Sequence, residues 1–519
     1  MFLLIFFIIL TGYFYLRLPK KRRKHTNIHQ SLNIRRKLRV SNIENVKWDA
    51  VVIGSGPSGL GVANYLSRLD WRVLVLEQNE VLGGGLHTFS KNACTFHSGL
   101  HYVGCGTDMI NTLNKLTAPE VVEWKDMLPV YDRIRIGDEE VDLKGGEGAW
   151  MASMLKIFPD KQTTLEAYLH EVRKVKSTSV RLFFVLKAVN IPHSIRVVLQ
   201  RLLCKQYFEL AGKTVDEVLD RVVGTDTKLR AFLVGQQGDY GLAPDTASWF
   251  VHAGVVAHFM DGGMVPVNNS SDIVQKLAKP ITDRGGFLFA QADVGEIIVQ
   301  DGQTKGVVVN GKTINCKVVV SSIGVLPTYN LAQKCPPPSL LSLKESYANS
   351  FLFLVFHNCP GTIEHNTWYY ENLSTKQPVF FSPLQKQITE GVYTMILISE
   401  ETPGSERHTE TERLKAALFQ VFPELEDFLH EEFSGDGKTC EKFLGRVGVY
   451  GLSGDCDRFV CKDLQVKVPE VKGLFLTGQD IVTAGFAGAF ASAEITANVV
   501  SGYGNISSIL CGKNLQNAI

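Results

Sequence analysis

Three glycines spaced as G-x-G-x-x-G constrain the fold of this chain more than any other feature of its sequence. They are Gly54, Gly56 and Gly59, and they separate two apolar runs. The elements predicted around them are strands at 49–53 and 72–76 and a helix at 58–69. In such a β-α-β unit the first glycine permits the tight turn and the second lets the backbone approach a pyrophosphate. The third lets the helix pack on the strand, so the stretch predicts a dinucleotide site.

Two further features favour FAD over NAD as the dinucleotide. Glu77 closes the second strand, where its carboxylate can accept hydrogen bonds from a ribose diol. Gly83 and Gly84 follow at once and let the chain fold back over the pyrophosphate, with Thr88 able to donate a hydrogen bond. Classical NAD dehydrogenases lack this second glycine element, whereas flavoprotein oxidoreductases often have it.

A third element lies near the other end of the sequence. An apolar strand at 474–477 leads into Gly478, Gln479 and Asp480, and a helix rich in small residues is predicted at 484–500. In flavoproteins such a strand ends beside the ribityl chain, with the acid on a ribityl hydroxyl or a phosphate. The positive end of the following helix then points at the flavin. The three elements in this order predict a flavoprotein.

The order of these elements predicts the fold class and the domain organisation. The chain of 519 residues is long enough for two or three domains. We expect an α/β protein with a discontinuous Rossmann-like FAD-binding domain of the glutathione-reductase or amine-oxidase type and an inserted α+β substrate domain. The FAD-binding domain is assigned to 48–115, 265–330 and 465–503, the substrate domain to 116–264 and 331–464, and a C-terminal tail to 504–519.

The middle and later parts of the chain carry local signals of both kinds of element. The helices predicted there are at 165–176, 179–189, 214–222 and 413–421. The strands predicted there are at 318–320, 351–356 and 392–398. Asp301-Gly302 and Asn310-Gly311 predict two hairpin turns between short strands.

The N-terminus predicts attachment to a membrane. Residues 1–16 are almost wholly apolar, and Leu18 extends the run to 1–18. A basic linker, 19–47, follows, with positive clusters at 20–25 and 35–37. We favour an uncleaved anchor, which by the positive-inside rule leaves the catalytic body in the cytosol. A cleaved signal peptide and a helix lying in the membrane interface remain alternatives.

Charge and cysteine usage exclude other classes of partner. The formal net charge is +1, so no global basic surface predicts nucleic-acid binding. Ten cysteines are scattered without a C-x-x-C pair. This pattern indicates reduced thiols and predicts no zinc or other metal site.

Several motifs together resemble a known family. They are VVIGSGPSGL, VLVLEQ, GGGLHTF, SGLHYVG, GDYGLAP, MDGGMVP, VVSSIG and LTGQDIVTAGFAGAF. In this order, over roughly 48–500, they resemble the retinol saturase (all-trans-retinol 13,14-reductase) family, within the carotenoid desaturase and isomerase group of flavoproteins. The resemblance implies FAD contacts at Gly54, Gly56, Gly59, Glu77, Gly83, Gly84, Thr88, Val294 (through its backbone, on the adenine side), Gly478, Gln479 and Asp480.

The resemblance also implies an activity and a location. The implied reaction saturates one double bond of all-trans-retinol, giving all-trans-13,14-dihydroretinol, at the endoplasmic reticulum membrane or an adjoining membrane. The chain departs from the family at Asn268-Asn269, where Gly-Gly is usual, at Gly85-Leu86, where Cys-Cys is usual, and at His97, where an acid is usual. Asparagine adopts left-handed backbone less freely than glycine, so we expect a strained turn at Asn268-Asn269.

Saturating a polyene needs a hydride at one carbon and a proton at the other, so the sequence must supply a proton donor. His101 and Tyr102, on the loop after the flavin segment, are the first candidates. His252 and His258 are second, and their spacing of six keeps them off a common helix face. Tyr240 is a candidate for lining the cavity. No second G-x-G-x-x-G unit is present, so the electrons are expected from a donor protein or a weakly bound NAD or NADP.

Three other functions use the same nucleotide frame. A carotenoid or polyene isomerase or desaturase needs the same flavin site. An amine oxidase shares the glycine elements but places an aromatic cage at the flavin, and the sequence identifies none. A flavoprotein that binds retinoids without turnover is the last alternative, and Asn268-Asn269 is the feature that favours it.

Overall fold

The computed structural model describes residues 34–35, 46–127, 129–359 and 363–502. The predicted membrane segment at 1–18, most of the basic linker and the tail at 504–519 lie outside these residues. Within the described ranges, no helix is both long enough and apolar enough to cross a bilayer.

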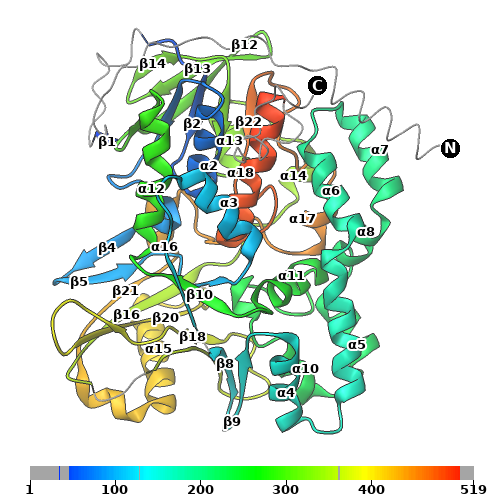
Figure 1. Ribbon diagram of the computed structural model, residues 1–519, viewed down its shortest axis with the longest axis vertical. Coiled ribbons are helices and arrows are strands. Elements are labelled where there is room, and N and C mark those ends of the chain that lie inside the picture. Colours follow the sequence, from blue (N-terminus) through cyan, green and yellow to red (C-terminus); the bar gives the residue numbers. More distant parts are fainter. Residues whose placement is uncertain (1–33, 36–45, 128, 360–362, 503–519) are drawn as a thin grey trace.

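A six-stranded parallel sheet forms the nucleotide-binding part (Figure 1). Its strands in spatial order are β1 (Ile34–Arg35), β11 (Phe287–Phe289), β3 (Val73–Leu76), β2 (Ala50–Ile53), β15 (Val319–Ser321) and β22 (Leu474–Leu476). Every residue of β2 and β3 is buried, as expected for parallel strands covered on both faces. β1 shows that the segment expected to be a linker adds an edge strand to this sheet.

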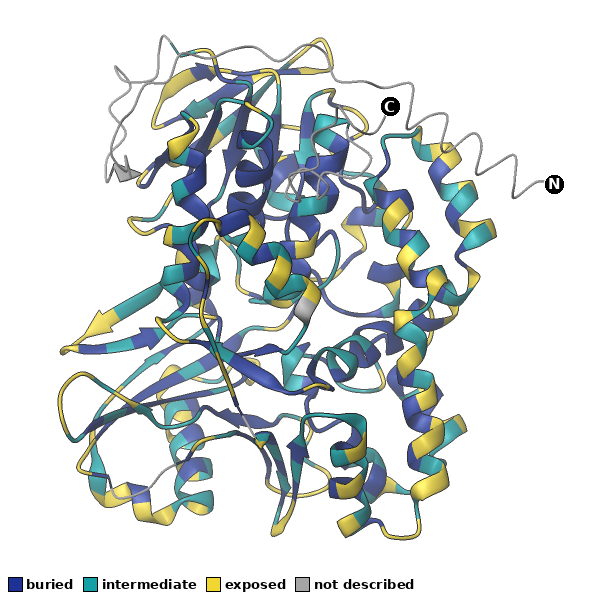
Figure 2. Ribbon diagram, viewed as in Figure 1, coloured by how far each residue is buried: buried dark blue, intermediate teal, exposed yellow. Residues whose placement is uncertain are grey.

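Helix α2 (Pro57–Ser67) connects β2 to β3, so the predicted β-α-β unit is confirmed. It packs between α12 (Ser270–Asp283) and α18 (Gly485–Ser501). Figure 2 shows α2 and the neighbouring strands as the most continuously buried part of the fold. The predicted 484–500 helix is α18, and its N-terminus points toward the second part of the molecule (Figure 1).

A mixed sheet forms one layer of the second part, in the lower half of Figure 1. Its strands are β21 (Leu429–Gly435), β16 (Asn349–His357), β20 (Val392–Glu400), β18 (Val379–Phe381), β17 (Asn366–Tyr370), β8 (Val130–Ile136) and β9 (Glu139–Lys144), with β19 (Gln385–Lys386) paired to β20. Only β17 and β8 pair in parallel within this sheet. Helix α15 (Arg407–Val421) packs on β16 and completes an apolar core there.

A layer of helices covers the other side of the second part. These helices are α4 (Glu147–Ile157), α5 (Gln162–Arg173), α6 (Thr178–Ala188), α7 (His193–Leu203), α8 (Lys205–Ala211), α9 (Val215–Val222), α10 (Thr227–Leu233) and α11 (Trp249–Phe259). The predicted helices at 165–176, 179–189 and 214–222 are confirmed as α5, α6 and α9. Strands β8 and β9, which precede these helices along the chain, were not among the predicted elements.

The hairpin predictions are confirmed by β12 (Val294–Gln300), β13 (Gln303–Val309) and β14 (Lys312–Asn315). Asp301, Gly302, Asn310 and Gly311 all have positive φ, between 47° and 75°. Two consecutive residues of this kind match the right-handed twist of the flanking strands.

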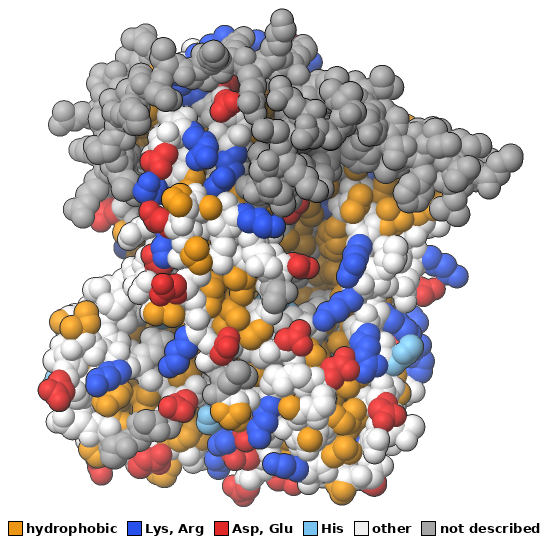
Figure 3. All heavy atoms as spheres, in the orientation of Figure 1, with side chains coloured by type: hydrophobic (Ala, Val, Ile, Leu, Met, Phe, Trp, Pro, Cys, Tyr) orange, Lys and Arg blue, Asp and Glu red, His pale blue; other side chains and the backbone are white. Residues whose placement is uncertain are grey.

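The chain has further strands and helices. They are β4 (Thr88–Lys91), β5 (Cys94–His97), β6 (Val103–Gly104), β7 (Trp124–Asp126), β10 (Gly263–Pro266), α3 (Thr107–Thr117), α13 (Val325–Leu331), α14 (Pro338–Leu341), α16 (Gly437–Leu444) and α17 (Cys456–Val460). Figure 3 shows basic and acidic side chains interspersed on the face in view, with no large area of one sign.

The strained turn expected at Asn268-Asn269 is present at the start of α12. Asn269 has φ 76° and ψ 168°, a backbone region that is almost confined to glycine. Its Oδ1 accepts hydrogen bonds from the Ser271 amide (3.0 Å) and the Ser271 hydroxyl (2.8 Å). Two local hydrogen bonds therefore hold asparagine where the turn geometry favours glycine.

We expect Asn269→Gly to stabilise the protein by about 1 kcal/mol. Relief of the backbone strain gains ~1–3 kcal/mol, and loss of the cap and the greater freedom of unfolded glycine offset part of it. Thermal unfolding followed by circular dichroism measures the change. Asn358→Gly is the control, since exposed Asn358 (φ 53°) has a left-handed φ that asparagine tolerates. A lower Tm for Asn269→Gly would show that the two hydrogen bonds outweigh the strain.

Candidate functional site

The glycine turn between β2 and α2 is closely packed at Gly54 and Gly59 and open at Gly56. A Cβ on Gly54, whose φ is 90°, would lie 2.4 Å from Ser322 Oγ. A Cβ on Gly59 would lie 2.2 Å from the Gly54 carbonyl oxygen, so neither position admits a side chain. A Cβ on Gly56 would meet no atom within 4 Å. Gly56 therefore presents bare backbone at the N-terminus of α2, where anions bind.

The second glycine pair folds over this turn, as the sequence predicted. A Cβ on Gly84 would lie 3.2 Å from Gly56 Cα, and the Gly83 amide donates to Ser55 Oγ (2.9 Å). Both glycines have positive φ, 121° at Gly83 and 54° at Gly84. Thr88 begins β4 and its hydroxyl lies 2.6 Å from Ser271 Oγ, which ties the segment to the start of α12.

Glu77 lies at the end of β3 beside the same turn and is buried. One carboxylate oxygen accepts from the Ser55 amide (3.0 Å) and hydroxyl (2.7 Å), and the other accepts from Asn79. The Ala292 amide donates to the Glu77 carbonyl (2.8 Å), which brings the segment leading to Val294 to this end of the sheet. Glu77 and Val294 thus lie on one side of the turn, where the resemblance places the adenosine.

Asp480 follows β22 and is buried with both carboxylate oxygens hydrogen-bonded. The amides of Val325 and Leu452 each donate to it at 3.0 Å, and Arg446 donates at 3.2 Å. Burial alone would raise the pKa of Asp480, but Arg446, Arg458 and the two amides hold it below its ordinary value. Asp480 is therefore a charged anchor for the 478–481 turn. Sequence reasoning expected it on a ribityl hydroxyl or phosphate, and did not foresee these protein partners.

Gln479 and Gly478 complete this turn in front of α18. The Gln479 side chain donates to the Val449 carbonyl (2.9 Å) and accepts from the Gly485 amide (3.4 Å) at the first residue of α18. Gly478 has φ 112°, and its amide donates to Ser492 Oγ (2.8 Å). The turn thus packs against α18 and lies close to the first turn of α2, which follows the first glycine segment.

A cavity of about 350 Å³ begins at this point and runs toward the mixed sheet. At one end it is lined by residues 484–487 at the N-terminus of α18 and by 99–103, which lead from β5 into β6. Its walls are largely aromatic and aliphatic, with Phe259, Trp368, Phe380 and Phe486 among them. Polar and charged groups at the sheet come from Asn349, Lys376, Gln377, Ser399 and Glu400. Its size and its mixture of apolar walls with a few polar groups are those of a small-molecule site.

The structure brings three of the predicted candidates to this cavity and leaves two outside it. His101, Tyr102 and His258 line it. Burial and the nearby His97 lower the pKa of His101 to about 3, and burial lowers that of His258 to about 4. Both imidazoles are therefore neutral, and His258 Nε2 accepts a hydrogen bond from a backbone amide of β6 (2.8 Å).

His252 lies in the core of the helical layer, although it shares α11 with His258. Its two ring nitrogens are hydrogen-bonded to the Tyr168 hydroxyl (2.9 Å) and the Tyr240 hydroxyl (3.1 Å). Burial lowers its pKa to about 3, so it is neutral. His252 and Tyr240 are not among the residues that line the cavity, because the predicted difference in helix face turns His252 inward.

Sequence reasoning missed two acids beside Tyr102. The Tyr102 hydroxyl lies 3.0 Å from Asp132 Oδ2 and 2.9 Å from Asp239 Oδ2, and Asp239 lines the cavity. Asp132 is fully buried in β8 and alternates in phase with Ile134 and Ile136. A charged residue in the inward phase of an alternating strand is a signal that the sequence offered.

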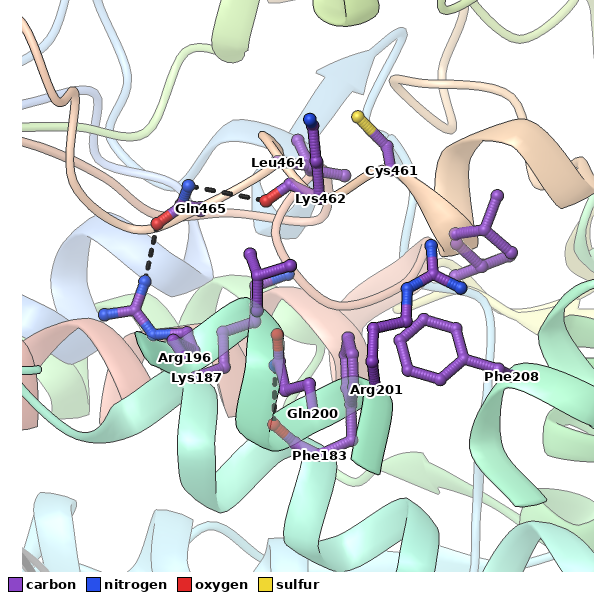
Figure 4. Close-up of a pocket in the computed structure, with 13 residues that line it drawn as sticks. Phe183, Lys187, Arg196, Gln200, Arg201, Phe208, Cys461, Lys462, Leu464 and Gln465 are labelled. Atoms are coloured by element: carbon purple, nitrogen blue, oxygen red, sulfur yellow. Dashed lines mark hydrogen bonds between the residues drawn. The ribbon is translucent and has the colours of Figure 1, made fainter. Parts of the chain in front are cut away.

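A second, much smaller cavity of about 20 Å³ lies between α6, α7 and residues 459–465 (Figure 4). Arg196 donates to Gln465, and Gln200 donates to the Phe183 carbonyl. Lys187 is buried there, and its ammonium donates to the Ile481 carbonyl. This space is too small for a substrate, but it backs onto the turn that carries Asp480.

The residues present fit a flavin. The open backbone at Gly56, the N-terminus of α2 and the folded-over Gly84 form a cradle that a single Cβ would fill, which suits a pyrophosphate. The cavity begins at the N-terminus of α18, which is the positive end of the helix dipole. A flavin ring bound there would face a substrate in the cavity. These groups would hold the cofactor, and bound flavin supplies hydride chemistry there.

Fold and site together define the class of this protein, an oxidoreductase with a flavin cofactor. A model of the NAD(P)-binding Rossmann-like domain matches residues 52–116. The fold is similar to that of cyclohexylamine oxidase from Brevibacterium oxydans, with a TM-score of 0.60 and 15% identity over 90% of this chain and 99% of that one.

Within that class, the chain is similar over most of its length to all-trans-retinol 13,14-reductase, as the sequence motifs indicated. It is 27% identical to the Homo sapiens protein of that name, over 88% of this chain and 85% of the relative. It is 23% identical to prolycopene isomerase 1, chloroplastic, of an Oncidium hybrid cultivar, over 88% and 85% of the two chains. The resemblance to this group of proteins is therefore confirmed.

Proposed function

We propose that this protein is an FAD-dependent reductase that saturates the 13,14 double bond of all-trans-retinol, giving all-trans-13,14-dihydroretinol. The observation that carries the proposal is the apolar cavity of about 350 Å³ that begins at the N-terminus of α18, beside the dinucleotide cradle. The similarity to all-trans-retinol 13,14-reductase over 88% of the chain supports the choice of substrate.

The chain's own residues bind and orient the polyene. Phe380 and Trp368 offer flat apolar walls to a conjugated chain, and Phe486 lies at the flavin end of the cavity. Asn349 at the mixed sheet offers hydrogen bonds to a terminal hydroxyl, and Ser399, whose hydroxyl donates to the Pro378 carbonyl, can accept one. Holding one double bond at the flavin end places the reacting carbons for hydride transfer. A proton donor must face the opposite carbon, since saturation adds both.

The first experiment identifies the cofactor and then the product. Protein purified in detergent is expected to show flavin absorbance, and mass spectrometry of the released cofactor is expected to give FAD. All-trans-retinol added to the chemically reduced protein without oxygen is expected to gain two hydrogens, with a blue-shifted polyene spectrum. A released cofactor other than FAD contradicts the cofactor assignment, and retinol of unchanged mass contradicts the reductase.

The same measurement distinguishes the closest alternative. Retinol or a carotenoid of unchanged mass but new retention time would identify an isomerase, which the similarity to prolycopene isomerase favours. Bound flavin with no change in retinoids or carotenoids would favour a binding protein without turnover. The electron source follows from the rate at which NADH or NADPH bleaches the bound flavin. No bleaching by either would favour a donor protein.

We further propose that the protein works at the endoplasmic reticulum membrane or an adjoining one, with its catalytic body facing the cytosol. The support is the apolar run at 1–18 and the basic residues behind it. The full chain is expected to remain with membranes after an alkaline wash and to be digested by protease added to intact vesicles. Release by the wash contradicts membrane insertion, and protection from protease contradicts the orientation.

A further inference from the structure

Tyr102 bridges two aspartates that come from distant parts of the chain. Asp132 is on β8, whereas Asp239 ends the short 3-10 helix Gln237–Asp239, between α10 and α11. The Tyr102 hydroxyl is within hydrogen-bond distance of both, at 3.0 Å and 2.9 Å. Asp132 is fully buried behind the tyrosine, and Asp239 is half-buried because it faces the cavity.

The donors around Asp132 identify it as the ionised acid. The side-chain amide of Asn366 donates to Asp132 Oδ1 (2.8 Å), and the side-chain amide of Gln236 donates to Asp132 Oδ2 (2.6 Å). The indole N–H of Trp368, which can only donate, also reaches Oδ2 (3.2 Å). Such a set of N–H groups stabilises a carboxylate. Tyr102 is therefore the fourth donor to Asp132.

A count of protons then fixes the state of Asp239. A phenol carries one O–H, and Tyr102 has given it to Asp132. The 2.9 Å contact between Tyr102 and Asp239 is a hydrogen bond only if Asp239 supplies the proton. The order of donation is thus from Asp239 to Tyr102 and from Tyr102 to Asp132. Asp239 is a carboxylic acid at the wall of the cavity.

The electrostatics agree with this order. Burial raises the pKa of Asp239 well above its ordinary value, and the neighbouring charge of Asp132 raises it further; the contact with Tyr102 lowers it, but by less than burial raises it. Burial and the two carboxyl groups also raise the pKa of Tyr102, which remains a phenol. Burial also raises the pKa of Asp132, to about 6, but hydrogen bonds from Asn366, Gln236, Tyr102 and Trp368 oppose that rise, so Asp132 is the stronger acid of the two. The histidines at the cavity are neutral and are much weaker acids than a carboxyl group.

We propose that Asp239 is the proton donor of the reduction, with Tyr102 and Asp132 as the residues that position its proton. The inference rests on the proposed function. The C=C π bond breaks, one carbon takes the hydride supplied by the reduced flavin, and the other takes the proton of Asp239. Bound reduced flavin would supply that hydride with its two electrons, and Asp239 is left as a carboxylate toward which Tyr102 can turn its O–H. Water entering the cavity restores the proton to Asp239.

The test compares Asp239→Asn with Asp245→Asn in full-length protein that carries its flavin. Asp245 is exposed, six residues further along, and is not among the cavity-lining residues. Infrared spectroscopy of the resting protein is expected to show a protonated carboxyl band that Asp239→Asn removes and Asp245→Asn keeps. Reoxidation of the reduced protein by retinol is expected to slow by about 10²–10⁴-fold in Asp239→Asn, with flavin occupancy unchanged.

Tyr102→Phe is the second variant, because it keeps the carboxyl group and removes its hydrogen-bond acceptor. It is expected to shift the carboxyl band and to slow turnover by about 10-fold. If the wild-type protein reduces retinol and Asp239→Asn does so at a near-normal rate, Asp239 is not the donor. The same holds if Asp239→Asn leaves the carboxyl band in place. Either result overturns the assignment of the donor and leaves the proposed function standing. Wild-type protein that reduces no polyene overturns the proposed function and the donor role with it, even where the carboxyl band is present.

Discussion

Gly56→Ala is expected to give a folded protein that binds its flavin more weakly. The backbone at Gly56 (φ −63°, ψ 176°) suits any residue, and no atom lies within 4 Å of the added methyl group. The same methyl group would occupy the space where backbone approaches a pyrophosphate. Hydrogen bonds to a charged group contribute about 1.5–3 kcal/mol each, so losing one weakens flavin binding roughly 10- to 100-fold. The ratio of flavin absorbance to protein after gel filtration measures the loss.

Two matched glycine variants separate the cofactor from the fold. Gly59→Ala is expected to lower the Tm of flavin-free protein, because its Cβ would lie 2.2 Å from the Gly54 carbonyl and overpacking costs about 1–3 kcal/mol. Gly148→Ala, within α4 and also without an atom in reach, is expected to keep both flavin and stability. Full flavin occupancy in Gly56→Ala would mean that the cofactor does not lie over this turn.

The nucleotide-binding part was predictable because its signals are local. Each of its features has a recognisable sequence pattern within about 20 residues. These features are a glycine at a tight turn, a strand buried on both faces and a helix of small residues. The hairpin at Asn310-Gly311 is another example, since two residues with positive φ are needed there and the sequence supplies the usual pair. The strained turn at Asn269 was also foreseen, as a departure from a glycine that the geometry still favours.

The second part was less predictable because its order comes from pairings between distant segments. The parallel pairing of β8 with β17 joins Asp132 to Asn366, and no periodicity within either strand specifies it. The same pairing brings amide and indole donors to a buried acid. Tyr102 was chosen as a candidate for its position after the flavin segment, but its two acids come from other segments. Asp239 was passed over for its neighbour Tyr240, which packs against His252 in the core.

Lys187→Met is expected to stabilise the protein at neutral pH and to lose that advantage as the pH rises. Lys187 is buried on α6 beside the smaller cavity (Figure 4). Burial, with the charges of Arg458 and Arg196, lowers its pKa to about 7. An unfolded lysine titrates at about 10.4, so between about pH 7 and pH 10.4 the unfolded state binds more protons than the folded state. Stability of the wild-type protein therefore rises with pH across that window.

The difference between variant and wild type isolates this lysine. At about pH 6 the charged ammonium costs the folded state on the order of 4 kcal/mol, and near pH 10 only about 0.7 kcal/mol. The hydrogen bond to the Ile481 carbonyl is lost at every pH, which lowers the stability of the variant by a constant ~1–3 kcal/mol. The Tm of Lys187→Met relative to wild type should thus be higher at about pH 6 than at about pH 10. Lys205 on α8 is the control, because its side chain is 86% exposed and its charge is not buried. The Tm difference between Lys205→Met and wild type should be the same at both pH values. If the Tm difference between Lys187→Met and wild type is also the same at both pH values, water reaches this ammonium. In that case no buried charge lies next to the turn that carries Asp480.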